Sequence, residues 1–264
     1  MTDAHRAGPN WPFWVTIAVV AIAYLAFLLG LLLATATYTS PHHMIRALAS
    51  KEIQYAAGLS LVTCTITALL SLIIAVPVGY LMSRGHFPCK NVVDAFLDVP
   101  IVLPPMVIGL CLLIFFQTPF GLAIQKVVPF TYTVNGVLLA QLVVGAAFAI
   151  RQMRTTFDHL AVRPEDVAMT LGCSRGRAVW LVTLPAAKRG MFSAASVAWA
   201  RSLGEFGPIL VFAGATRMKT EVLPTTVWLE LSVGNLEAAI AVSLMMVLLA
   251  VVVLIAMRAV GERP

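Results

Sequence analysis

Long apolar segments alternate with short polar segments along most of the chain. A bilayer core about 30 Å thick takes about 20 apolar residues in a helix, because lipid offers no partner for backbone N–H and C=O groups. The segments that are long and apolar enough lie at roughly 13–35, 56–82, 95–117, 133–150, 190–214 and 236–257. The alternating pattern of a membrane β-barrel, in segments of about 10 residues, is absent. The sequence therefore predicts an all-α, polytopic membrane bundle of six transmembrane helices.

The composition places the chain in the same class. Hydrophobic residues make up 60% of the 264 positions and charged residues only 11%, and the mean hydropathy is +0.91. An ordinary soluble domain carries roughly 25% charged residues. We therefore expect an integral membrane protein.

The first apolar segment has two interpretations. Arg6, the apolar run and the small residues Ala34-Thr35-Ala36 also resemble a signal peptide with its cleavage site. The run is longer than the apolar core of a signal peptide, which usually has roughly 7–15 residues. The sequence favours a retained transmembrane helix over a cleaved signal.

Basic residues indicate the orientation, because Lys and Arg in short loops are retained on the cytoplasmic side. With the N-terminus in the cytoplasm, twelve fall on that side: Arg6, Arg84, Lys90, Arg151, Arg154, Arg163, Arg175, Arg177, Lys188, Arg189, Arg258 and Arg263. Five fall outside: Arg46, Lys51, Lys126, Arg217 and Lys219. Both termini are therefore expected in the cytoplasm. The net charge of +6 follows from this asymmetry and suits anionic lipid, and its spread along the membrane boundary does not indicate nucleic-acid binding.

Residue types that carry catalytic or metal chemistry are scattered. The four cysteines stand far apart, at Cys64, Cys89, Cys111 and Cys173. Neither a disulfide nor a Cys/His metal site is expected from them. His42 and His43 are adjacent in an expected external loop, where solvated histidines are a simpler interpretation than a ligand pair. Walker, GxSxG and HExxH motifs are absent, so we expect the chain itself to hold no catalytic residue, metal or cofactor.

A charged and basic segment, residues 165–185, stands between two long apolar segments. Pro164 suits the first turn of a helix, and Glu165 and Asp166 follow where negative charge complements the helix dipole. Gly172 suits a helix stop. We expect a short helix of about two turns outside the membrane, with an apolar face formed by Val167, Ala168 and Leu171. By pattern alone, this helix equally suits a connector resting on the membrane interface or a docking element for a groove on another protein.

The same segment resembles the cytoplasmic coupling loop of ABC-transporter permeases. In that family the loop reads acidic-Ala-Ala, three residues, Gly, nine residues, Ile, one residue, Leu-Pro. The matching positions are Asp166, Val167, Ala168, Gly172, Val182, Leu184 and Pro185. Three positions depart from the pattern but leave its spacing intact: Asp166 replaces Glu, Val167 replaces the first Ala and Val182 replaces Ile. The resemblance implies that the helix docks on an ATP-binding subunit, through Glu165, Asp166, Val167, Ala168, Leu171, Gly172, Leu184 and Pro185.

Two further segments, residues 92–118 and 198–245, resemble permeases of the molybdate type within the type I importer group. Their most specific part is ARSLGEFGP, residues 200–208. The resemblance implies the type I ABC importer (MetI-like) permease fold. It divides the chain into a cytoplasmic tail, peripheral first helix and external loop over 1–55, a transmembrane domain of five core helices with a coupling loop at 158–190 over 56–258, and a cytoplasmic tail at 259–264.

The same resemblance implies an assembly and a cargo. The chain would pair with a second copy of itself, with two cytosolic ATPases that bind ATP and Mg, and with an external protein that delivers an oxyanion. The location would be the plasma (inner) membrane of a bacterium or archaeon. Molybdate or tungstate is the expected cargo, and sulfate or thiosulfate is the alternative.

Two charged residues fall at membrane depth. Arg201 and Glu205 lie four residues apart, on one face of a helix, and are able to pair. A charge at that depth is costly unless it is paired or faces a watery cavity. The pair either neutralises itself and locks its helix, or lies at the gate, where Arg201 offers positive potential to a dianion. Gly204, Gly207 and Pro208 favour close packing and a kink at this point.

Pro100, Pro104 and Pro105 interrupt the third apolar segment, as a tolerated kink or as a hinge. The candidate residues of the gate and pathway are Pro104, Pro105, Arg201, Gly204, Glu205 and Gly207. Asp94 and Asp98, one turn apart, are expected at the membrane interface rather than in a proton relay.

Two segments, 118–132 and 216–235, are expected on the external face. By resemblance they would receive the binding protein, although their charges equally suit solvated loops. Trp228 suits an anchor at the membrane interface. A self-contained secondary transporter or channel is the main alternative, but the two halves of the chain show no convincing repeat. A membrane enzyme would need a His/Asp/Glu cluster at membrane depth, where only Glu205 clearly qualifies.

Overall fold

A computed structural model describes residues 11–38 and 41–261 of the chain. Its elements are α1 (Trp11–Thr37), α2 (Pro41–Leu48), α3 (Lys51–Arg84), α4 (Lys90–Val102), α5 (Pro105–Phe115), α6 (Pro119–Val127), α7 (Val134–His159), α8 (Arg163–Thr170), α9 (Arg175–Ala178), the π-helix η1 (Val179–Thr183), α10 (Leu184–Leu203), the π-helix η2 (Ile209–Ala213), α11 (Leu223–Ser232) and α12 (Leu236–Gly261). Within these two ranges no residue is in a strand. The expected all-α class is confirmed.

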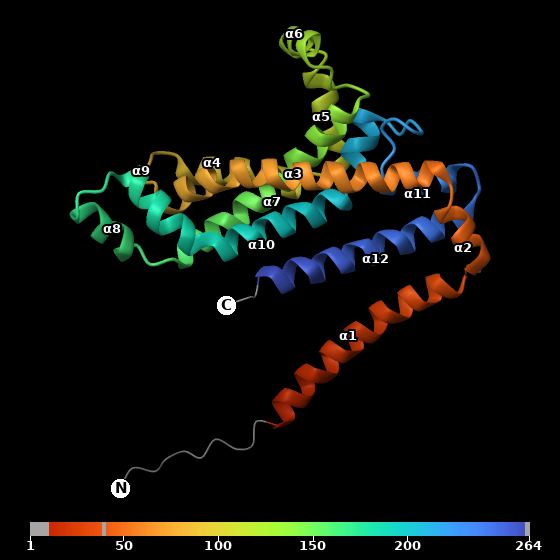
Figure 1. The fold of residues 1–264 in the computed structure, drawn as a ribbon, viewed down its shortest axis with the longest axis horizontal. Helices are drawn as coiled ribbons and strands as arrows, with labels where there is room; N and C mark the ends of the chain where they lie inside the picture. Colours follow the sequence, from red (N-terminus) through yellow and green to blue (C-terminus); the bar gives the residue numbers. More distant parts are fainter. Residues whose placement is uncertain (1–10, 39–40, 262–264) are drawn as a thin grey trace.

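Helices α3, α7 and α10 pack together as the core of the bundle, and α12 packs against α10 and α11 (Figure 1). The buried face of α3 is built from small residues that recur every three or four positions: Ser60, Cys64, Thr67, Ser71 and Ala75. Small side chains at this spacing allow helices to approach closely where lipid supplies no hydrophobic driving force. The helical spacing of small residues therefore gives α3 its packing face.

Short helices lie at the two ends of the bundle. α8 and α9 lie at the end where α3 finishes, and α2 and α11 lie at the opposite end (Figure 1). The α5 and α6 helices project from the side of the bundle, and α1 stands apart with its apolar stretch unburied (Figure 1). α8, in the expected coupling loop, is thus separated by the length of the bundle from α11, which lies in the expected external segment 216–235.

Four described helices, α1, α3, α7 and α12, are long and apolar enough to cross a membrane. The pair α4 and α5 passes the same test together, but the two helices are bent by 109°. The 20-residue α10 carries Lys188, Arg189 and Arg201, which lower its apolar content. The helices agree with a multi-pass membrane protein, and the number of six spans stays a prediction.

Two of the expected spans are interrupted. The segment 95–117 is divided after Val102, because Pro104 and Pro105 lack the N–H that would continue the helical ladder. Pro104 and Pro105 therefore mark a sharp break between α4 and α5, whereas Pro100 is accommodated inside α4. In the segment 190–214, α10 ends at Leu203. An irregular stretch begins at Gly204, and the π-helix η2 follows it.

The expected external loop after the first helix is largely helical. It contains α2 and the start of α3, where the Ser50 hydroxyl accepts a hydrogen bond from the Ile53 N–H at 3.3 Å and caps the helix. α12 continues to Gly261, into the expected C-terminal tail. The tails at 1–10 and 262–264 and the side chains of His42 and His43 lie outside the described residues.

Candidate functional site

The α8 helix lies outside the bundle, with the two-turn length that the sequence predicts. Pro164 occupies its first turn, and Gly172 follows its end with φ of +93°, a conformation that glycine adopts without a Cβ penalty. The Cys173 N–H donates to the Ala168 carbonyl and the Gly172 N–H donates to the Met169 carbonyl. This is the Schellman arrangement, and it ends the helix where the sequence indicated.

One face of α8 is apolar and open. Val167 is 55% exposed and Leu171 is 81% exposed, and Asp166 is exposed beside them. Trp180 and Leu181 of η1 are also exposed, at 71% and 58%. These two residues were not among the predicted docking residues, because their place beside an expected span gives no signal that separates them from lipid-facing positions. An apolar surface on a protruding helix suits a groove on another protein.

Glu165 differs from the other predicted docking residues. Its side chain is only 6% exposed, and it accepts a hydrogen bond from the Tyr80 hydroxyl at 2.5 Å and another from the Thr183 hydroxyl at 2.8 Å. Arg175 lies 4.0 Å from the same carboxylate. Glu165 therefore contacts its own chain, and Tyr80 and Thr183 are site residues that sequence reasoning missed.

Leu184 and Pro185 start α10 rather than extend the face of α8. Leu184 is half-buried and packs against the core of the bundle, whereas Pro185 is exposed in the first turn. The docking role of Asp166, Val167, Ala168 and Leu171 stays a prediction.

The structure brings together prolines and a glycine of the expected gate. Gly207 lies against the start of α5, so closely that a Cβ there would fall 2.9 Å from the Met106 nitrogen and 3.1 Å from the Pro105 carbonyl carbon. Gly109 of α5 lies equally close to Pro208. The break at Pro104 therefore lets α5 turn onto the segment that follows α10, and the expected close backbone approach is found at Gly207.

Arg201 and Glu205 pair as the sequence predicts, with Arg201 Nη2 at 3.6 Å from Glu205 Oε2. The Glu205 side chain is 1% exposed and the Arg201 side chain 36%. The guanidinium also lies over the ring of Phe148, 5.4 Å from its centre, in a cation–π arrangement. Gly204 sits beside the pair without close contacts, since the nearest atom to a Cβ there would be 3.9 Å away.

Asp94 and Asp98 each form an ion pair with α7. Asp94 pairs with Arg154, and Asp98 pairs with Arg151. These two pairs fasten α4 to α7.

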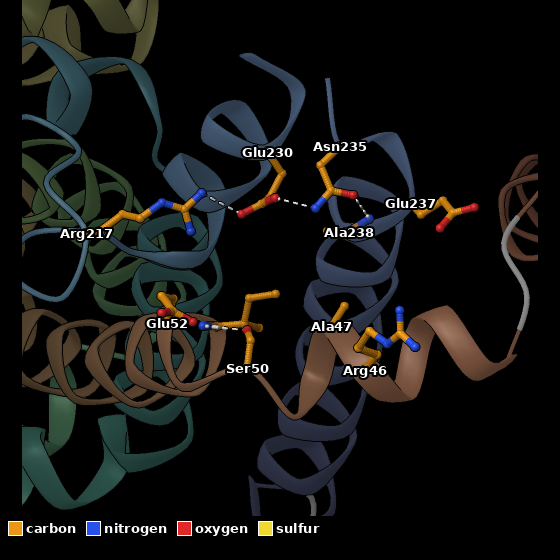
Figure 2. A pocket seen from close by; sticks show the side chains of 10 residues that line it. Arg46, Ala47, Ser50, Glu52, Arg217, Glu230, Asn235, Glu237 and Ala238 are labelled. Atoms are coloured by element: carbon orange, nitrogen blue, oxygen red, sulfur yellow. Dashed lines mark hydrogen bonds and ion pairs between the residues drawn. The ribbon is translucent and has the colours of Figure 1, made fainter. Parts of the chain in front are cut away.

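A charged cluster lies at the end of the bundle opposite α8. Arg217 donates to Glu230 Oε1 at 2.7 Å, and Asn235 donates to Glu230 Oε2 at 2.9 Å (Figure 2). Glu221 is fully buried, 4.0 Å from Arg217. Burial raises the pKa of the Glu221 carboxyl above its ordinary value, and the nearby Arg217 charge offsets only part of this effect.

A cavity of about 440 Å³ opens beside this cluster. Its charged lining comes from four helices and the loop before α11: Arg46, Glu52, Arg217, Glu230 and Glu237 (Figure 2). It gives this end of the molecule a recess of mixed charge. Trp228, the expected interfacial anchor, is 42% exposed on α11 nearby.

The described residues contain no group of His, Cys, Asp and Glu suited to a metal ion. The four cysteines are free.

The family model for the binding-protein-dependent transport system inner membrane component matches residues 75–264. A probable molybdenum ABC transporter permease protein of Haloferax volcanii is 34% identical over 225 residues, covering 85% of this chain and 82% of that protein. A molybdate/tungstate transport system permease protein of Pyrococcus abyssi is 41% identical over 154 residues, 58% of each protein. A sulfate transport system permease protein of Synechocystis is more distant, at 27% over 260 residues.

Solved structures show the same fold. One chain of a bacterial alginate ABC transporter, in complex with its periplasmic protein, superposes with a TM-score of 0.76 over 96% of this chain and 95% of that chain, at 14% sequence identity. This likeness confirms the helical importer-permease fold. Because the family match extends over most of the sequence and includes α8 and the Gly207 contact, the chain belongs to the family of inner membrane components of binding-protein-dependent transport systems.

Proposed function

We propose that the chain is the membrane-spanning permease subunit of an ATP-driven importer that carries an oxyanion, molybdate or tungstate. The open apolar face of α8, held outside the bundle, is the observation that carries this proposal, because a self-contained transporter has no need of it. The relatives named for molybdenum and for molybdate/tungstate support the cargo. Sulfate or thiosulfate is the less favoured cargo, since the relative named for sulfate is more distant.

The proposed assembly contains two copies of this chain, two cytosolic ATPases and an external binding protein. In this assembly α8 and both termini lie on the cytoplasmic side, and the end with α2 and α11 faces outward. ATP and Mg are bound by the ATPases and not by this chain, which has a non-catalytic role. The mixed-charge recess beside Arg217 and Glu230, together with segment 118–132, contributes to the surface that receives the binding protein.

The proposed mechanism is alternating access. ATP binding closes the ATPases and draws the two α8 helices together, and the segments around Pro105, Arg201 and Gly207 then open outward. Hydrolysis resets the inward-facing state. A ligand shifts such an equilibrium only through different affinities for the two states, and ATP and the loaded binding protein supply that difference.

Co-purification with candidate ATPase subunits from the same genome tests the proposal. The variant is Leu171→Glu, which places a charge on the open face at the end of α8, where the side chain is 81% exposed. The matched control is Leu231→Glu, at a 50% exposed position on α11 at the opposite end. We expect the wild type and the control to retain the ATPase and Leu171→Glu to lose it.

A wild-type chain that captures no ATPase would overturn the proposal. Retention of the ATPase by Leu171→Glu would place the docking surface elsewhere.

A further inference from the structure

We infer that Glu165 is the positioning residue that joins α8 to the membrane bundle and makes the two move together. The inference rests on the proposed docking of α8 to an ATPase. It assigns to Glu165 an internal role, distinct from the contact with the ATPase that the sequence suggested for it.

The carboxylate of Glu165 joins three parts of the chain. Oε1 accepts from the Tyr80 hydroxyl of α3, and Oε2 accepts from the Thr183 hydroxyl of η1, at 2.5 and 2.8 Å. Arg175 of α9 stands 4.0 Å away and places positive charge beside it. Each oxygen thus has its own hydroxyl donor, an arrangement in which an ionised carboxylate acts only as an acceptor. We call Glu165, Tyr80 and Thr183 the clasp.

The two donors are themselves fixed to core helices. The ring of Tyr80 packs edge-on against Phe157 of α7, with centroids 5.6 Å apart and an interplanar angle of 90°. Phe157 is fully buried, and Thr183 is buried directly before Leu184, where α10 begins. A displacement of the Glu165 side chain therefore acts on α3, α7 and the first turn of α10.

The clasp is the main polar link between α8 and the bundle. Within the described residues, Glu165 is the only side chain of α8 with a hydrogen bond to another element, since the Thr170 hydroxyl bonds to the Val167 carbonyl inside α8. The outer face of α8, with Leu171, remains open. One helix thus presents an apolar surface outward and a single buried carboxylate inward.

α10 extends the link to the gate residues. It starts beside Thr183 and continues without interruption to Leu203, and Arg201 lies in its last turn. A helix of this length is about 30 Å long at 1.5 Å per residue. Movement of α8 that is passed to the start of α10 by the clasp therefore reaches the Arg201–Glu205 pair through one helix.

The test measures transport per ATP hydrolysed in liposomes that hold the chain, its ATPase and molybdate-loaded binding protein. Glu165→Gln keeps the shape of the side chain and replaces one acceptor oxygen with a donor NH₂. Tyr80→Phe and Thr183→Val each remove one hydroxyl donor. Tyr24→Phe, at a 63% exposed position on α1, is the control for loss of a tyrosine hydroxyl. Co-purification of the ATPase is measured for every variant, because the docking face with Leu171 is left intact.

We expect ATPase capture to stay normal in all variants and transport per ATP to fall about tenfold in Glu165→Gln, the scale of one hydrogen bond to a charged group. Tyr80→Phe and Thr183→Val are expected to give smaller losses that do not add to that of Glu165→Gln, because the three groups act as one unit. Tyr24→Phe should match the wild type.

Normal transport per ATP in Glu165→Gln, with normal ATPase capture, would overturn the inference and leave the proposed function standing. If Glu165→Gln fails to insert, the hydroxyl variants decide, and full coupling in both would overturn the inference. Failure of the wild type to capture an ATPase would instead overturn the proposed function, and the inference with it.

Discussion

Two buried carboxylates, Glu205 and Glu221, each have an arginine nearby at ion-pair distance. Glu205 is 1% exposed and relies on one guanidinium at 3.6 Å, and Glu221 is fully buried with Arg217 at 4.0 Å. Removing the partner of a buried charge leaves that charge without compensation and costs more than the pair contributes. Removal of either arginine therefore needs a second substitution, at its carboxylate, that separates loss of fold from loss of function.

Arg201→Ala is expected to lower the free energy of unfolding by about 1–3 kcal/mol, because Glu205 loses its partner. The double variant Arg201→Ala with Glu205→Gln removes the stranded charge and should recover most of that stability. Thermal unfolding in detergent measures both. If the pair acts at the gate, oxyanion uptake stays low in the stable double variant.

Normal uptake by the correctly inserted double variant would contradict the pathway role. The pair would then serve only to neutralise charge inside the bundle.

Glu221 gives the protein a pH dependence. Its pKa is raised in the folded chain above the ordinary value of 4.5, so the stability that the protonated form contributes is present below that value and is lost as pH rises through the raised pKa. Glu221→Gln should therefore unfold at a higher temperature than wild type at neutral pH, by a few degrees. The difference should shrink as the pH falls toward 4.5.

The unfolding temperatures of the two proteins across this pH range provide the check. If the difference in unfolding temperature is constant with pH, or grows in acid, burial of the ionised Glu221 carboxylate does not destabilise the fold.

At the scale of elements, local signals in the sequence predicted α8 better than they predicted the spans. Pro164 and Gly172 mark the two ends of α8 because each acts on its own turn of backbone. The clasp was missed because Tyr80 and Thr183 stand 85 and 18 residues from Glu165, and no pattern in one sequence joins positions at those separations. The prolines predicted a kink or a hinge in segment 95–117, but not the 109° bend, beyond which α5 lies against Gly207 and Pro208.

The contact of α5 with Gly207 can be tested with a matched pair of alanines. Gly207→Ala is expected to destabilise the fold by about 1–3 kcal/mol, because its Cβ would lie 2.9 Å from the Met106 nitrogen and 3.1 Å from the Pro105 carbonyl carbon. Gly204→Ala, where no atom lies closer than 3.9 Å, should be close to neutral. Thermal unfolding in detergent compares the two, and equal effects would refute close packing at Gly207.

For the whole molecule, the distribution of basic residues predicts the orientation, which stays a prediction, and the fold shows only which elements share an end of the bundle. The end that carries α8 and α9 is the end where α3 finishes, and α2 and α11 lie at the other (Figure 1). Helix number was harder to predict, because α10 combines membrane-span length with Lys188, Arg189 and Arg201. Such a helix fits a bundle interior better than a lipid-exposed position. The residue pattern alone does not distinguish a helix in the bundle interior from one that faces lipid.

Labelling with a membrane-impermeant maleimide tests the orientation. Cys89 is exposed before α4, and Cys173 is half-buried after α8. Both should react in inverted membrane vesicles and stay unmodified in intact cells, because the membrane shields the cytoplasmic end. Ser232→Cys, at an exposed position at the end of α11, should react in intact cells. Reaction of Cys173 in intact cells would reverse the orientation and place α8 on the outside.

The proposed function requires this chain to couple ATP hydrolysis on a partner to the passage of an oxyanion. ATP-driven molybdate accumulation in liposomes that hold the chain, its ATPase and loaded binding protein measures this coupling. Accumulation is expected to require both partners and ATP, and to be abolished by Leu171→Glu. Molybdate accumulation by the chain alone, driven by an ion gradient, would overturn the proposed function and make this protein a secondary transporter.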